Sequence, residues 1–81
     1  MLIKDRLGKF SISLDLIEQH PAAVCLLFKD IIVLEATWNK KSLSIDYFAC
    51  SKLFNYQTYP YNIPTYMLEL APDNTVVATI I

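Results

Sequence analysis

The chain has 81 residues, of which 54% are hydrophobic and 19% are charged, with a formal net charge of −1. This length predicts a single domain over residues 1–81, small enough to bury only roughly 60 to 65% of the surface that its unfolded chain exposes. All Lys and Arg lie before residue 53, and no uncharged run reaches the roughly 20 apolar residues of a bilayer span, so we expect neither nucleic-acid binding nor membrane insertion.

Residues 10–14 alternate apolar and small polar side chains, which is typical of a half-buried strand. Asp15 followed by Glu18 is a helix-capping pattern. The sequence therefore predicts a strand that leads into one short helical turn over residues 16–20, ended by Pro21.

Two β-rich runs follow, at residues 22–28 and 31–38, with only Lys29 and Asp30 between them. A two-residue connection between such runs predicts a hairpin. Both runs are apolar on their two faces, as in strands that are covered from both sides, so we expect them at the centre of the sheet.

The second half of the chain predicts three more strands. Residues 42–49 alternate with a period of two after a turn-like segment at 39–41, and they are expected to pair with the preceding strand. Residues 65–71 and 75–81 flank a Pro-Asp-Asn turn and form the last hairpin. The final residues are uncharged and β-prone, so this strand is expected to be central or paired across a dimer.

Together these elements predict a mainly β fold of the β-rich α+β kind. We expect a small antiparallel meander of about six strands, curved into a strongly bent sheet or an open barrel, with one short helical turn. The chain has a single glycine, Gly8, whereas barrel corners usually depend on several, so a tightly closed barrel is disfavoured.

Aromatic residues are concentrated in one part of the sequence. Nine of the ten lie between Phe28 and Tyr66, and residues 56–66 combine four tyrosines and two prolines without a charge. Such a segment either covers the open side of the sheet or presents a recognition surface, and long loops are commonly functional. The predicted partner- or ligand-binding residues are Phe54, Tyr56, Tyr59, Tyr61 and Tyr66.

Residues 1–7 contain no uninterrupted apolar core of signal-peptide length, so we expect the protein in the cytoplasm of its host cell. In that compartment Cys25 and Cys50 are expected to be free, packed thiols. One histidine, His20, supplies no set of metal ligands. We therefore expect no metal and no cofactor.

The candidates for catalysis are few. His20 stands just before a proline, and Lys52 follows Cys50 by two residues, a spacing that any strand end can show. The carboxylates Glu35, Asp46 and Glu69 lie in predicted strands, where solvated acids are ordinary. We assign no catalytic residue and expect no enzymatic activity.

The apolar fraction exceeds the roughly 45 to 50% of ordinary soluble domains, and so small a chain cannot enclose all of it. We therefore expect a homo-oligomer, a dimer or larger, and a protein partner. The alternative is a nucleotide-like small ligand held in a tyrosine-lined pocket at a subunit boundary.

Residues 45–54, followed by residues 63–66, resemble small accessory proteins of phages and mobile elements, although they contain no family motif. This resemblance implies a viral protein that binds and blocks a larger one, such as a host defence enzyme.

Overall fold

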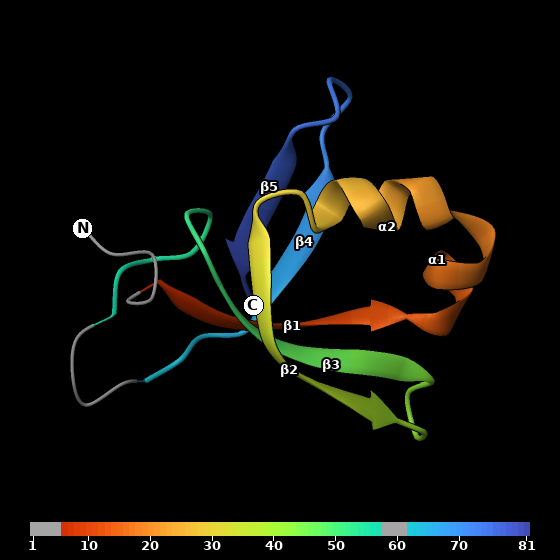
Figure 1. The fold of residues 1–81 in the computed structure, drawn as a ribbon, viewed down its shortest axis with the longest axis horizontal. Coiled ribbons are helices and arrows are strands. Elements are labelled where there is room, and N and C mark those ends of the chain that lie inside the picture. The colour runs from red at the N-terminus through yellow and green to blue at the C-terminus, as the bar shows by residue number, and fades with distance from the viewer. Residues whose placement is uncertain (1–5, 58–61) are drawn as a thin grey trace.

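The computed structural model describes residues 6–57 and 62–81, which form two antiparallel sheets and two helices (Figure 1). The first sheet has the strand order β1-β3-β2. The second is the β4–β5 hairpin. The strands are β1 (Leu7–Ser13), β2 (Ile31–Asn39), β3 (Ser44–Ser51), β4 (Tyr66–Leu70) and β5 (Val76–Ile80).

The expected mainly β class is confirmed. In place of a single meander of about six strands, however, the described residues form five strands in two sheets, and they close no barrel. The non-local pairing of β1 with β3 explains the difference, because it places β3 at the centre of its sheet.

The short helices α1 (Leu14–Gln19) and α2 (Pro21–Leu27) follow β1 directly. The side chain of Ser13 caps α1 by accepting a hydrogen bond from the Leu16 backbone nitrogen at 3.2 Å. The helical turn is thus confirmed, but it starts earlier than expected, and Asp15 lies in its first turn instead of capping it.

The strand predicted at residues 22–28 is wrong, since α2 occupies this segment. Pro21 is at the start of α2, where its missing N–H costs nothing, and two alanines follow it. The inward face carries Val24 and Leu27, spaced as on a helix. Periodicity alone does not separate a short apolar helix from a buried strand, so the β-prone composition misled the prediction.

The central position predicted for residues 31–38 is also wrong. Without a strand at 22–28, β2 pairs with β3 alone among the described residues, and it forms the edge of its sheet. Its pairing with residues 44–51, expected as a hairpin, is confirmed. The Asn39 side chain holds this turn by accepting hydrogen bonds from the backbone nitrogens of Lys41 at 3.1 Å and Ser42 at 3.3 Å.

The last hairpin is confirmed, with Tyr66 opposite Ile80. Its turn is held by Asp73, whose carboxylate accepts hydrogen bonds from the Thr75 backbone nitrogen at 3.1 Å and the Thr75 hydroxyl at 2.6 Å. The hydroxyl bond, followed by the backbone bond, keeps the pKa of Asp73 below its ordinary value.

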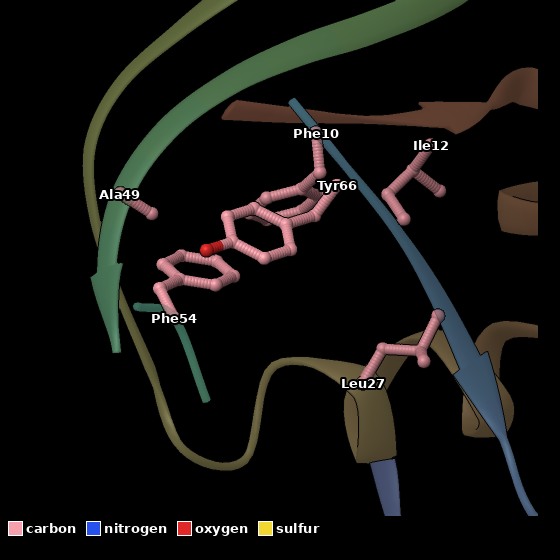
Figure 2. Close-up of a cluster of buried hydrophobic side chains, with 6 residues drawn as sticks. All are labelled: Phe10, Ile12, Leu27, Ala49, Phe54 and Tyr66. Atoms are coloured by element: carbon pink, nitrogen blue, oxygen red, sulfur yellow. The ribbon is translucent and has the colours of Figure 1, made fainter. Parts of the chain in front are cut away.

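The core lies between the inner face of the three-stranded sheet, helix α2 and the β4–β5 hairpin. Figure 2 shows its six buried side chains: Phe10, Ile12, Leu27, Ala49, Phe54 and Tyr66. The rings of Phe54 and Tyr66 are stacked, with centroids 4.6 Å apart and planes at 21°. Offset stacking of this kind adds to the stabilisation from burial itself.

Gly8 has no side chain, and the stacked rings of Phe54 and Tyr66 occupy the space beside its Cα atom. A Cβ atom placed on Gly8 would lie 2.8 Å from ring carbons of both Phe54 and Tyr66, closer than real Cβ atoms approach other atoms. Both rings are buried, so they have little room to move away. The backbone of β1 is therefore glycine at the point where the two rings approach it.

We expect Gly8→Ala to lower the free energy of unfolding by about 1 to 3 kcal/mol, because it forces a methyl group into a packed core. Urea unfolding measures this effect. Lys9→Ala, one residue further along the same strand and exposed, is the matched control and should change the value by less than about 0.5 kcal/mol. An unchanged or raised midpoint for Gly8→Ala, the usual result at an open strand position, would contradict the close packing.

Candidate functional site

Two of the predicted binding residues are part of the core. Phe54 and Tyr66 are 1% and 3% exposed, so their rings offer almost no surface to another molecule in this structure. The Tyr66 hydroxyl accepts a hydrogen bond from the Asn55 backbone nitrogen at 2.8 Å. The structure thus brings these two residues together as a contact between the residues that follow β3 and the start of β4.

The other three predicted residues have different positions. Tyr56 is half exposed, whereas Tyr59 and Tyr61 lie outside the described residues. At the end of the aromatic segment, residues 56–66, the Pro64 carbonyl accepts a hydrogen bond from the Lys9 backbone nitrogen at 3.0 Å, and Thr65 makes a parallel bridge to Lys9. This end of the segment therefore lies along the edge of β1, and binding by the tyrosines stays a prediction.

The most exposed apolar part of the three-stranded sheet is β2, a strand that contains none of the predicted binding residues. Four large hydrophobic side chains of this one strand are between 41% and 53% exposed: Ile32, Val33, Leu34 and Trp38. No residue in the described part of the chain pairs with the outer edge of β2 (Figure 1). Its unpaired backbone groups and apolar side chains thus lie next to each other.

The register of β2 with β3 assigns its side chains to two faces. Ala36 and Trp38 lie opposite Tyr47 and Ile45, on the inner face that carries the core. Glu35 and Thr37 lie opposite Phe48 and Asp46, on the outer face. The register shifts between Val33 and Glu35, so Leu34 is the extra residue of a β-bulge.

The outer face of the sheet contains an open pocket of about 500 Å³. Its volume is within the range of about 300 to 1,000 Å³ that is typical of ligand pockets. All three strands and the end of the aromatic segment line it, with side chains that include Lys9, Ser11, Glu35, Thr37, Asp46, Phe48, Ile63 and Thr65.

The two carboxylates of this pocket differ in their contacts. Asp46 is held in place by hydrogen bonds from the Ser11 hydroxyl at 2.6 Å and the Asn39 amide at 3.2 Å. The Glu35 side chain has no ion-pair or hydrogen-bond partner within residues 6–57 and 62–81. The charged side chains of the pocket are therefore Asp46, which is held by hydrogen bonds, Glu35, which has no partner among the described residues, and Lys9.

The remaining candidates for chemistry are separate from one another. His20 is exposed at the junction of the two helices, and Cys50 is buried in β3. Glu69 lies on β4, on the other sheet from Glu35 and Asp46. Within the described residues, no group of three His, Cys, Asp or Glu side chains is placed to hold a metal ion.

The sequence of β2 contains a signal for this edge, but the signal has two meanings. Nine consecutive residues with one charge, apolar on both faces, are typical of a strand covered from both sides. The same pattern describes an edge strand that another chain covers. Choosing between these meanings requires knowing that residues 21–27 are helical.

Comparisons with protein-family models, with curated proteins and with solved structures gave no match. In the described part of the chain, neither helix has the length or the apolar character needed to cross a membrane.

The expected packing of both thiols is confirmed for Cys50 and wrong for Cys25. Both are free, but Cys25 is exposed because it lies on the outward face of α2. We expect an alkylating reagent to modify Cys25 rapidly in the folded protein, and Cys50 only after unfolding. Peptide mass spectrometry distinguishes the two sites, and equally fast modification of both would contradict this burial pattern.

Proposed function

We propose that this chain is a non-enzymatic interaction protein that binds a larger protein partner by adding a strand of that partner to the free edge of β2. The observation that carries the proposal is the combination, in one strand of nine residues, of an edge with which no described residue pairs and four exposed large hydrophobic side chains. Single exposed hydrophobic residues are ordinary, but a contiguous group along an edge is typical of an interaction surface.

Strand addition fits the physical character of this edge. Backbone N–H and C=O groups along the edge supply hydrogen bonds to an extended segment, and the side chains on the two faces supply selectivity. Trp38 is the single tryptophan of the chain and is half exposed at the end of the strand. Tryptophan is among the residues that contribute most to binding energy in interfaces.

The resemblance of residues 45–54 and 63–66 to phage accessory proteins favours an inhibitory form of this binding, in which the chain occupies a surface of a host enzyme. A second edge supports self-association. β5 is the outer strand of a two-stranded sheet and carries exposed Val77 and Ile80, so of its two expected placements, pairing across a dimer is the one we retain.

Binding of a nucleotide-like ligand has less support. The described residues do form a pocket, but its charged side chains are two carboxylates and one lysine, which repel a phosphate overall. Phe54 and Tyr66, two of the aromatic residues expected to line such a site, are buried in the core.

Trp38→Ala tests the proposed partner surface. We expect it to weaken partner binding by roughly 2 kcal/mol or more, the usual scale of an interface hot spot, because the ring is a large exposed anchor on β2. The assay is capture from lysate of the native host on the immobilised chain, followed by quantitative mass spectrometry and by titration with the captured protein.

The control for Trp38→Ala is Met67→Ala, a similarly exposed hydrophobic residue on β4 of the other sheet, with circular dichroism to show that both variants are folded. A partner that binds wild type and Trp38→Ala equally would remove β2 as the binding surface. Capture of the chain itself alone would shift support to ligand binding.

Val77→Lys tests self-association through β5. We expect light scattering at micromolar concentration to give at least twice 9.3 kDa for wild type and 9.3 kDa for Val77→Lys. Lysine on an edge strand opposes pairing between chains, and Val77 lies opposite Glu69, so the new charge is compatible with the fold. A monomeric wild type, or a variant that still associates, would contradict pairing through β5.

A further inference from the structure

The pocket on the outer face of the sheet extends to the free edge of β2. Glu35 and Thr37 belong both to β2 and to the pocket lining. A strand added to this edge would therefore direct alternate side chains over the pocket. Backbone pairing at this edge does not by itself use the pocket. The Glu35 carboxylate contacts no partner among the described residues.

We infer that this pocket receives a lysine or arginine side chain from the strand that pairs with β2. The inference rests on the proposed strand addition and specifies the chemistry of the partner.

Charge on the β2 side of the pocket favours a cation. Glu35 is the single charged residue of β2, and no described residue neutralises it. Asp46, on the adjacent strand, is fixed by Ser11 and Asn39 and adds a second negative charge on the same face. Lys9 lies on β1, opposite Phe48, with β3 between it and Glu35.

The spacing of strands keeps Lys9 away from an added cation. Neighbouring strands lie about 4.8 Å apart, so the backbones of β1 and β2 are separated by about 10 Å. A residue of the added strand opposite Glu35 would have its Cβ atom about 4.5 to 5.5 Å from that of Glu35. Its ammonium or guanidinium group would then reach the carboxylate of Glu35 well before it approached Lys9.

Phe48 completes the recognition of a cation. It lies directly opposite Glu35 in the register and lines the pocket. The face of an aromatic ring attracts an ammonium or guanidinium group. An arginine or lysine that contacts Glu35 therefore also has an aromatic surface for its apolar stem.

The two faces of β2 together define the partner strand. On the inner face, apolar side chains of the partner strand would pack against Ala36 and Trp38. On the outer face, a basic side chain would pair with Glu35. The partner strand should thus alternate apolar and polar residues, with a lysine or arginine among the polar set. A second copy of this chain fits less well, because a symmetric pair centred on Glu35 places two carboxylates opposite each other.

A library of random ten-residue peptides displayed on phage, selected on the full chain, tests the inference. We expect enrichment of alternating sequences with lysine or arginine at a polar position. Each selected peptide is then synthesised with that basic residue and with threonine in its place. Both are titrated into the protein, with a blue shift of Trp38 fluorescence as the signal that β2 is covered.

The basic peptide should bind about two- to fivefold more tightly than its threonine counterpart, the usual worth of a cross-strand charge pair. Glu35→Gln should abolish that difference, whereas the control Glu69→Gln, exposed on the other sheet, should preserve it.

Four outcomes would contradict the cationic pocket or the strand addition on which it rests. Equal affinity of the two peptides, or a preference that persists in Glu35→Gln, overturns the cationic pocket and leaves strand addition intact. A Trp38 shift that depends on protein concentration alone makes a second copy the occupant and also overturns it. No shift with any selected peptide overturns strand addition itself, and the inference with it.

Discussion

The stacking of Phe54 on Tyr66 beside Gly8 is the contact on which the rest of the structure depends. Phe54 follows the end of β3, Tyr66 begins β4, and Gly8 lies in β1, so one cluster joins both sheets. The hydrogen bond from the Asn55 backbone nitrogen to the Tyr66 hydroxyl fixes the same junction. The partly buried side chains of the β4–β5 hairpin pack around this cluster, and in so small a domain the core around these rings supplies much of the apolar burial.

This arrangement also determines which surface stays open. Helix α2 and the β4–β5 hairpin pack against the core that contains Phe10 of β1 and Ala49 near the end of β3. β2 lies beyond that cover, so its apolar side chains remain exposed although they resemble core residues in type. The same packing thus buries the side chains around β1 and leaves those of β2 exposed. We propose that the partner binds at β2.

The features predicted correctly from the sequence are those that neighbouring residues determine. The hairpins of β2 with β3 and of β4 with β5 followed from alternation and from turn residues such as Asn39 and Asp73. Helix α2 was missed because Val24, Cys25 and Phe28 favour strands, while its helical signals were Pro21 and two alanines. The pairing of β1 with β3 and the burial of Tyr66 are non-local, and no spacing in the chain encodes them. The candidate site was missed for the same reason, since an edge strand exists only relative to its sheet.

The β-bulge at Leu34 has a consequence for how many chains can assemble. A bulge increases the local twist of a strand and interrupts the even spacing of its hydrogen-bonding groups. A strand that slides along β2 therefore loses its match at the bulge, which favours a single alignment of the added segment. Fibrillar stacking requires flat, uniformly spaced edges, and β2 does not provide one. The irregularity thus opposes unlimited growth into fibrils at an apolar edge, which is the edge that we propose for partner binding.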